Sequence, residues 1–408
     1  MPIAPKLSIT QAEPSRNGKD SPPANSCSGA SFEQMALSHS LLDLIADDVA
    51  SGGLIDERDN AVLIYLVVLS RKTEKSLNLM IQGPSGSGKD MLLDSVLGVL
   101  PTSEVHRAST ITASSFYRAP EAPNSYKNKV LYLGERIRSN RPEQGDATKF
   151  MREFMSQGWV SRDVSEQTGE NGKWVTQEQI QYGPTVVAQS TTSASSTIFP
   201  EDMNRVVTIH PDVSEDHVMR CKKALFSPKR SPTEETIKRH MEFQRSLKMF
   251  PVHIPYGEWI AENSPHIVCL NRFFSDLKDL LTLLVLLHQF QRPLVDGVLV
   301  ATPQDYETVR GLLTRSVLSA LGSSEELMKL GKLGVFTQDQ GGTAIGKKRI
   351  TMTHRLNDFK TGWLANDQVE IVHQGRGNDP TGYKVNPLLC KNPLPELPKE
   401  VVCCIPIL

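Results

Sequence analysis

Apolar and polar positions repeat along the chain with two periods, which predict amphipathic helices and buried strands. Between residues 31 and 72, apolar side chains recur every three or four positions in "FEQMALSHSLLDLIADDV" and "DNAVLIYLVVLSRK", with a break at "SGG". Downstream, helical patterns at 90–100 and 146–158 alternate with apolar runs of strand length. These runs are "LNLMIQ" (77–82), "KVLYLGE" (129–135), "TVVAQSTT" (185–192) and "NRVVTIHPD" (204–212). This alternation predicts an α/β fold, a three-layer sandwich with a mostly parallel sheet and helices on both faces.

Two other patterns accompany that alternation. "WVSRDVSEQ" and "KWVTQEQIQY", joined by "TGENG" at 168–172, predict a β-hairpin inserted before the strand at 185–192. Apolar helical patterns at 272–292 and 303–320 predict a helical lid. The longest apolar run, "DLLTLLVLLHQF", is too short to cross a bilayer, so we expect a buried helix and no membrane contact.

The C-terminal part of the chain has a different pattern. "KKRITMTHRLNDFKTGWLANDQVEIVHQGRGNDPTGYKVNP" predicts a helix and two short strands around a Gly/Arg loop, the outline of a winged helix. The first residues are rich in Pro, Ser and Asn, which is typical of a disordered leader. The predicted divisions are a leader (1–30), N-terminal helices (31–72), a nucleotide-binding core (73–212), a helical lid (213–322), a winged helix (323–390) and a tail (391–408).

Composition narrows the class of protein. The 408 residues carry a formal net charge of −1, so any nucleic-acid surface must be local. Six cysteines are scattered without a C-x-x-C pair, which argues against a zinc module and a disulfide framework. The first twenty residues lack the apolar core of a signal peptide, so we expect a cytoplasmic protein.

The stretch "GPSGSGKDMLLDSV" matches a phosphate-binding loop except at one position, where Asp90 replaces the Ser or Thr that reaches Mg²⁺. Glycines between a buried strand and a helix let backbone N–H groups face an anion, and the helix N-terminus adds partial positive charge. Lys89 supplies a mobile cation for the terminal phosphates. We therefore expect ATP to bind here with Mg²⁺. The predicted contact residues are Gly83, Pro84, Ser85, Gly86, Ser87, Gly88, Lys89, Asp90 and Met91.

A second departure falls on the same metal. The Mg²⁺ of such sites is shared with an acid on the neighbouring strand, here expected to be "VLYLGE". That strand has Gly134 where the metal aspartate belongs, and it keeps Glu135 to orient the attacking water. We hypothesise a ligand swap in which Asp90 provides the metal contact. The alternative is decay, in which Asp90 repels the triphosphate and the protein binds ADP or hydrolyses little ATP.

Polar residues end the next strand, and a cation precedes the last one. Ser190, Thr191 and Thr192 follow a buried run, at the sheet edge where open α/β folds place ligand contacts. The alternative for them is a simple strand-to-loop turn. Arg205 could act on the γ-phosphate of a neighbouring subunit. Its alternative is a surface ion pair with Glu201 or Asp202.

This order of glycine loop, acid strand, hairpin, polar-tipped strand and arginine resembles an AAA+ ATPase of the MCM and superfamily III helicase branch. It is most similar to the helicase-type module of phage and mobile-element primases, over roughly residues 40 to 390. The resemblance implies a homo-hexameric ring with ATP between subunits. Lys89, Asp90 and Glu135 would act from one subunit and Arg205 from the next, Thr191 would sense the γ-phosphate, and Arg310 is a candidate lid sensor. The zinc-finger and polymerase-like regions of those primases are absent, so a primase is a possible partner.

Two surfaces are candidates for DNA. The resemblance implies that the hairpin enters a central pore, where Lys173 would follow the phosphates of single-stranded DNA beside Arg162 and Trp174. The alternative is an ordinary exposed hairpin. In the tail, Arg355 and the wing residue Arg376 belong to a basic cluster that could contact a duplex, and the alternative is a solvated charged face.

The sequence therefore favours an ATP-dependent DNA helicase or DNA-remodelling ATPase that serves replication of a phage or mobile element. The alternative is a non-hydrolysing, DNA-binding initiation scaffold whose assembly is controlled by nucleotide. A small-molecule kinase fits less well, because it has no use for the hairpin, the arginine or the winged tail.

Overall fold

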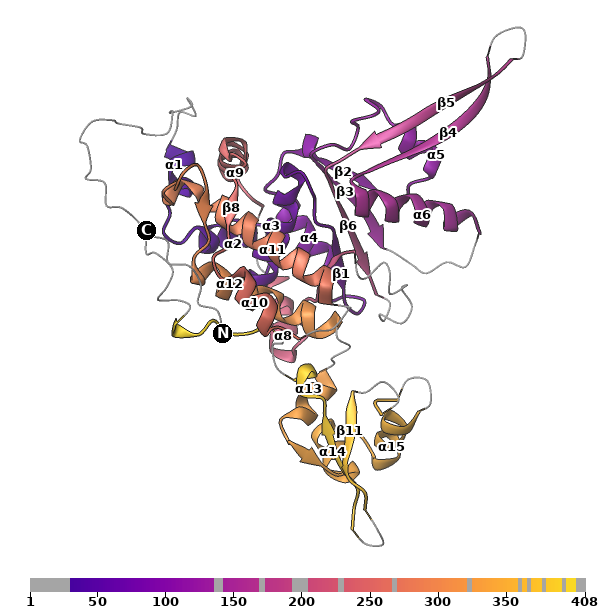
Figure 1. The fold of residues 1–408 in the computed structure, drawn as a ribbon, viewed down its shortest axis with the longest axis vertical. Helices are drawn as coiled ribbons and strands as arrows, with labels where there is room; N and C mark the ends of the chain where they lie inside the picture. The colour runs from indigo at the N-terminus through magenta and orange to yellow at the C-terminus, as the bar shows by residue number, and fades with distance from the viewer. Residues whose placement is uncertain are drawn as a thin grey trace, which may run out of the picture.

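The computed structural model describes residues 30–135, 142–168, 173–192, 205–226, 231–265, 270–320, 325–358, 362–364, 368–375, 379–390 and 394–400. A five-stranded sheet lies at the centre, in the order β2-β3-β6-β1-β7 (Figure 1). All neighbouring strands in this sheet are parallel. Its strands are β1 (Leu79–Gln82), β2 (Val105–Ala108), β3 (Lys129–Glu135), β6 (Thr185–Thr191) and β7 (Val207–Ile209). The predicted α/β fold with a mostly parallel central sheet is confirmed.

The strand order corrects one expectation. The acid strand β3 does not pair with the glycine-loop strand β1, because β6 lies between them. The register pairs Gln82 of β1 with Thr191 of β6, and Glu135 of β3 with Ser190 of β6. Parallel strands end at one edge, so the glycine loop, the acid and the polar tip of β6 still meet there.

Helices cover both faces of the sheet and bury separate cores. One core contains β1, β6 and β7 with α3 (Arg58–Leu69), α4 (Lys89–Leu97), α11 (Leu270–Leu287) and α12 (Pro303–Ala320). The other packs Met80, Leu131 and Val187 against α5 (Ala113–Tyr117) and α6 (Pro142–Gln157). Helix α3 is buried from Ala61 to Leu69, since α4, α11 and α12 all contact it. The predicted N-terminal helices and lid therefore share one core with the sheet.

A buried polar network joins the N-terminal helices to the region after the sheet. Helices α1 (Ala30–Ala36) and α2 (Leu41–Ala50) lie near α9 (Glu234–Ser246), and α1 packs on α9. Gln244 Nε2 donates to the Tyr65 hydroxyl at 2.8 Å, which leaves the Tyr65 proton for Nδ1 of His240, 3.0 Å away. The N–H at Nε2 of His240 then donates a hydrogen bond to Asp48 Oδ2 at 2.9 Å. This order of donors holds the imidazole neutral, and burial lowers the His240 pKa against the opposing pull of Asp48.

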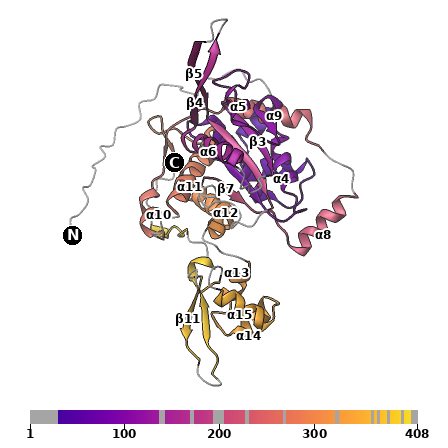
Figure 2. The same cartoon turned by 90° about the vertical axis from the view of Figure 1, so that its right-hand side faces the viewer.

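The predicted hairpin is present. Strands β4 (Trp159–Thr168) and β5 (Lys173–Tyr182) pair antiparallel over ten residues each, and the ribbon extends away from the sheet (Figures 1 and 2). Near its base it contacts α5 and α6. Residues 169–172 of the predicted turn lie outside the described residues.

The C-terminal region forms a separate unit with its own core. Its elements are α13 (Glu325–Gly331), β10 (Val335–Phe336), α14 (Gln338–Ala344), α15 (Arg349–Asn357), β11 (Val369–His373) and β12 (Gly382–Val385). The strands form an antiparallel sheet in the order β10-β12-β11. Buried residues such as Phe336, Met352 and Leu356 fill the space between sheet and helices. The predicted helix followed by two strands is present as α15, β11 and β12.

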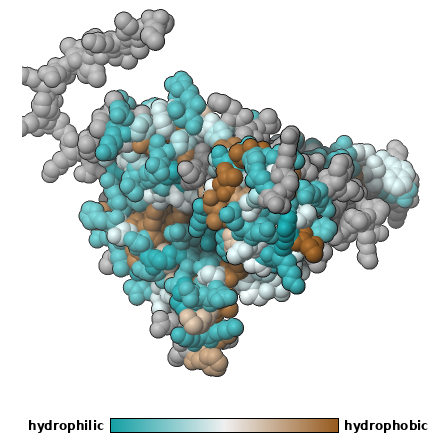
Figure 3. Space-filling model, turned by 90° about the horizontal axis from the view of Figure 1, so that it is seen from below, coloured by the Kyte–Doolittle hydropathy of each residue, from teal (hydrophilic) through white to brown (hydrophobic). Residues whose placement is uncertain are grey.

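Other elements complete the described chain. They are α8 (Glu215–Ala224), α10 (Gly257–Asn263), the paired strands β8 (Val252–His253) and β9 (Leu299–Val300), and the short 3₁₀ turns at Ser70–Lys72, Thr102–Glu104, Gln289–Gln291 and Pro387–Leu389. Residues 1–29 of the predicted leader lie outside the described residues, and Ala30 is the first residue of α1. Part of the predicted tail is ordered against α12, because Tyr306 donates to the Pro395 carbonyl at 2.7 Å and Leu394 is buried. Seen from the end carrying the C-terminal unit, the surface is largely hydrophilic, with separate apolar patches (Figure 3).

Candidate functional site at the carboxyl edge of the sheet

The glycine loop connects β1 to α4, as predicted. Gly86 and Gly88 have φ values of +79° and +80°, which side chains with a Cβ rarely adopt. A Cβ on Gly83 would lie 2.7 Å from Ser87 Oγ, so this position also needs glycine unless the hydroxyl moves. The loop therefore wraps tightly around the N-terminus of α4, whose first N–H groups have no partner within the helix.

Lys89 begins α4 and is 8 % exposed. Its Nζ donates to the carbonyls of Gly83 at 3.0 Å and Pro84 at 2.9 Å, which fixes the cation against the loop. Ser87 Oγ is buried and has no hydrogen-bond partner among the described residues. A buried cation, a spare hydroxyl and a helix N-terminus form a cradle that fits a phosphate chain.

Asp90 is exposed and hydrogen-bonds to side chains of two strands. Its Oδ1 accepts hydrogen bonds from the Tyr132 hydroxyl on β3 at 3.1 Å and, more weakly, from Ser190 Oγ on β6 at 3.5 Å. Burial, helped by the charge of Asp90, raises the pKa of Tyr132 to about 12, so the phenol keeps its proton at neutral pH. Tyr132 was not predicted as a site residue, because in "VLYLGE" it reads as one more core position.

Glu135 ends β3 at the same edge. Its Oε1 accepts hydrogen bonds from the backbone N–H of Thr192 at 3.2 Å and from the Thr192 hydroxyl at 2.5 Å. The pairing of β3 with β6 shifts register between Leu133 and Glu135, which turns the end of the strand. At Gly134, the nearest atom to an added Cβ is 3.7 Å away, so the structure has room for a side chain there.

Thr191 has a different environment from the one expected. Its side chain is fully buried, and its carbonyl accepts from the backbone N–H of Gly83 at 3.2 Å. The hydroxyls that meet the acids belong to its neighbours Ser190 and Thr192. Thr191 therefore links the end of β6 to the glycine loop, while the hydroxyls of Ser190 and Thr192 bond to Asp90 and Glu135.

Arg205 lies at the other edge of the sheet. It precedes β7, and Asn78, which precedes β1, donates to its carbonyl at 3.4 Å. Its Nε donates to Ser156 Oγ on α6 at 2.8 Å. The guanidinium therefore starts from the amino edge, away from its own glycine loop at the carboxyl edge. Glu201 and Asp202, the alternative partners, lie outside the described residues.

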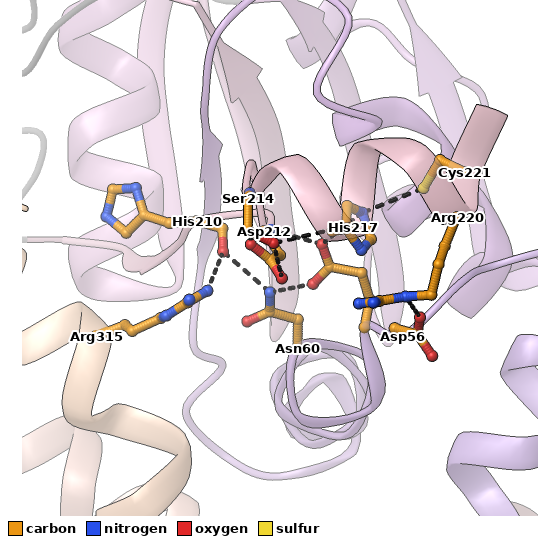
Figure 4. Close-up of polar contacts among 10 residues, drawn as sticks. Asp56, Asn60, His210, Asp212, Ser214, His217, Arg220, Cys221 and Arg315 are labelled. Carbon is orange, nitrogen blue, oxygen red and sulfur yellow. Dashed lines mark hydrogen bonds and ion pairs between the residues drawn. The ribbon is translucent and has the colours of Figure 1, made fainter.

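A pocket of about 500 Å³ lies beside the glycine loop. The two are neighbours because Asp212 lines the pocket and Pro211, the residue before it, lies against Gly83. A Cβ added to Gly83 would lie 3.3 Å from the Pro211 ring. The His210 carbonyl accepts from Asn60 Nδ2 at 3.0 Å and from Arg315 at 3.5 Å, which joins α3, β7 and α12 at this point (Figure 4). The lining residues are Asp56, Glu57, Arg58, Asp59, Asn60, Asp212, Gly311, Leu312 and Arg315.

Glu57 organises the floor of that pocket. Its carboxylate accepts from the Asp212 backbone N–H at 2.7 Å and from Asn60 Nδ2 at 2.6 Å. Nε2 of His217 on α8 lies 3.8 Å from Glu57 Oε1. The same nitrogen lies 3.3 Å from Sγ of Cys221, one helical turn further along α8 (Figure 4). Burial raises the pKa of the Cys221 thiol above its usual value, which favours the protonated thiol over the nucleophilic thiolate.

The lid cation also differs from expectation. Arg310 donates to the Leu394 carbonyl at 2.9 Å and pairs with Glu396 and Glu307, both at 3.1 Å. It therefore anchors the C-terminal segment to α12. Arg315, five residues later, is the α12 cation that lines the pocket beside the glycine loop.

The hairpin presents few cations. Arg162 donates to Gln179 Oε1 at 2.9 and 3.1 Å and lies 4.7 Å from the Tyr117 ring centroid, so it secures the base of the hairpin. The Lys173 side chain lies outside the described residues, whereas Trp174 is 68 % exposed. The hairpin sequence has two basic residues, Arg162 and Lys173, and four acidic residues, Asp163, Glu166, Glu170 and Glu178.

In the C-terminal unit, the Arg355 side chain is exposed and is held by two neighbours. It pairs with Glu326 at 3.3 Å and lies 6.0 Å from the Trp363 ring centroid. Further exposed cations lie at the start of α15, at Lys347, Lys348 and Arg349. Arg376 lies outside the described residues.

Comparison with protein-family models and with curated proteins finds no match to this chain. No group of three or more His, Cys, Asp or Glu side chains is arranged to hold a metal ion within the described ranges. Across the same ranges, no helix combines the length and apolar character needed to span a membrane.

Proposed function

We propose that the chain is an ATP-hydrolysing AAA+ protein of the MCM-like and superfamily III-like helicase branch. The observation that carries the proposal is the meeting of three groups at one sheet edge: the Lys89 cradle, the Asp90 carboxylate and the Glu135 carboxylate. The strand order supports it, since a polar-tipped strand separates the glycine loop from the acid. The hairpin, the helices after β7 and the separate C-terminal unit fit the same class.

Each site residue has a defined task in this proposal. The loop N–H groups and Lys89 bind the phosphates, and the first turn of α4 favours negative charge there. Asp90 is the protein ligand for Mg²⁺, which commonly takes one or two carboxylates and completes its shell with phosphate and water oxygens. The bound ion supplies neutralisation of phosphate charge. Glu135, held by Thr192, accepts a hydrogen bond from the attacking water and orients it.

Arg205 completes the site of a neighbouring subunit. Its start at the amino edge of its own sheet, away from its own glycine loop, supports a role on an adjacent protomer's phosphates. A site shared head-to-tail in this way repeats around a ring when the assembly closes, and we propose a homo-hexamer. Single-stranded DNA would pass the hairpins, with Trp174 available for base stacking. Duplex DNA would contact the start of α15 in a winged helix.

Such a ring would serve replication of a phage or mobile element in the cytoplasm, with a separate primase as possible partner. A second function, a nucleotide-controlled DNA-binding scaffold, is favoured by two observations. The metal position at Gly134 lacks a carboxylate, and Arg162 is held at the base of an acidic hairpin.

ATP turnover with and without single-stranded DNA tests the proposal, using wild type and Lys89→Ala. We expect DNA-stimulated hydrolysis in wild type and its loss in Lys89→Ala. Binding of a non-hydrolysable analogue with no turnover would favour the scaffold. Size-exclusion chromatography with that analogue should show a hexamer, and a strict monomer would contradict the shared site.

A further inference from the structure

We propose that Tyr132 is a positioning residue that orients the Asp90 carboxylate toward the nucleotide-bound metal. This inference rests on the proposed function, because it concerns the metal of the same site. In this proposal Tyr132 contacts neither the nucleotide nor the metal, and it affects metal binding only through its hydrogen bond to Asp90.

The hydrogen bonds at Asp90 use one side of the carboxylate. Tyr132 and Ser190 both donate to Oδ1, at 3.1 and 3.5 Å. Oδ2 is therefore left for a cation. Since Asp90 is exposed, its side chain would otherwise sample several rotamers, and a fixed Oδ1 removes most of that freedom.

Tyr132 is itself supported. The guanidinium of Arg107 on β2 lies 5.3 Å from the Tyr132 ring centroid and pairs with Asp94 at 2.5 Å. Asp94 is one helical turn after Asp90, so α4 is attached to β3 through Asp90 and to β2 through Asp94. These contacts fix the first two turns of α4 relative to β2 and β3.

The position of Gly134 explains why such support is needed. Tyr132 packs on the face of the sheet that α4 covers, and Gly134 follows two residues later, at the register shift near the end of β3. A metal carboxylate at residue 134 would be held by the strand itself. Asp90 is carried by the helix instead, and the hydroxyl of Tyr132 ties it to the strand that lacks the carboxylate.

Tyr132→Phe deletes the donor and keeps the ring. The measurement is Mn²⁺ binding by electron paramagnetic resonance, with a saturating non-hydrolysable ATP analogue, together with the affinity for the analogue without metal. We expect the Mn²⁺ dissociation constant to rise about tenfold, since a charge-assisted hydrogen bond contributes about 1.5 kcal/mol. The metal-free affinity and the thermal midpoint should stay unchanged. Ser190→Ala should have a smaller effect because its contact is longer.

Tyr126→Phe is the matched control, since it removes a buried tyrosine hydroxyl on the other face of the sheet. It should leave Mn²⁺ affinity unchanged. Wild-type affinity in Tyr132→Phe, with loss of Mn²⁺ binding in Asp90→Ala, would overturn the positioning role and leave the proposed function intact. Absence of metal-dependent nucleotide binding in wild type would instead overturn the proposed function.

Discussion

Oε1 of Glu135 accepts hydrogen bonds from both the backbone N–H and the hydroxyl of Thr192. Thr192→Val removes the hydroxyl and nearly preserves the shape. We expect kcat for ATP to fall about tenfold with little change in KM, since the water-orienting acid loses its fixed direction while phosphate binding is unaffected. Steady-state kinetics measures both constants, and Thr192→Ser should retain activity. An unchanged or higher kcat in Thr192→Val would contradict a positioning role for this hydroxyl.

The ligand swap predicts an unusual pattern among three variants. Asp90→Ala should lose at least about 100-fold in ATP turnover, because the site loses its metal carboxylate. Asp90→Ser combined with Gly134→Asp restores the usual arrangement of hydroxyl and strand acid, and should recover activity. Gly134→Asp alone fits sterically and serves as the control for the added side chain. Parent-like hydrolysis in Asp90→Ala would show that Asp90 does not hold the metal.

Arg205→Ala should bind ATP normally and lose about 1000-fold in turnover, as for other arginines that act in trans. Lys89→Ala should also lose ATP turnover, because the subunit loses the cation that binds the phosphates. Mixing the two inactive proteins tests the shared site directly, because an interface between an Arg205→Ala and a Lys89→Ala subunit can contain both wild-type groups. Partial recovery of ATP hydrolysis is expected. No recovery, with mixed rings present by native mass spectrometry, would place Arg205 outside the site.

The C-terminal unit predicts a contrast between two sets of cations. Lys347→Ala combined with Lys348→Ala should weaken duplex DNA binding about tenfold and reduce the salt dependence by about two phosphate contacts, since both side chains are exposed. Arg355→Ala should reduce DNA affinity less than the double change, because Glu326 and the Trp363 ring already engage the Arg355 guanidinium. Fluorescence anisotropy at several salt concentrations separates these outcomes. A larger loss in Arg355→Ala would reverse the assignment.

Buried His240 predicts a pH-dependent stability. Burial lowers its pKa below the usual 6.5, so the unfolded chain takes up a proton before the folded protein does. The contribution of neutral His240 to the free energy of unfolding is complete above pH 6.5. It is lost as the pH falls below that value, by about 1.4 kcal/mol per pH unit. Urea unfolding between pH 5 and 7 measures the slope. His240→Gln should reduce the slope and exposed His354→Gln should not; equal slopes in all three proteins would contradict this.

Several features could be predicted from the sequence because they depend on local pattern. The period of apolar residues marked four of the five strands of the central sheet: the strand before the glycine loop, the strand that ends in the acid, the strand after the hairpin and the strand after Arg205. The short strand β2 was not marked, because only two of its four residues are apolar. The glycine loop was predictable because glycines at 86 and 88 adopt positive φ, and Lys89 follows at the start of a helix. The hairpin strands and the C-terminal helix with two strands were also predictable, since turn residues separate them.

Other features depend on which segments pack together. The insertion of β6 between β1 and β3 could not be read from chain order, because any of several strand orders buries the same apolar runs. The partners of Arg162, Arg355 and Arg310 were equally inaccessible, since a basic residue in sequence carries no record of its partner.

The sequence by itself determined which groups the site offers: a glycine loop followed by Lys89, a carboxylate at residue 90 and none at residue 134. Only the tertiary structure decided which groups meet. It brought Tyr132 of β3 to Asp90 of α4, 42 residues apart, and Thr192 to Glu135, 57 residues apart. Such contacts follow from the strand order and the docking of α4 on the sheet, which the packing of the whole core fixes.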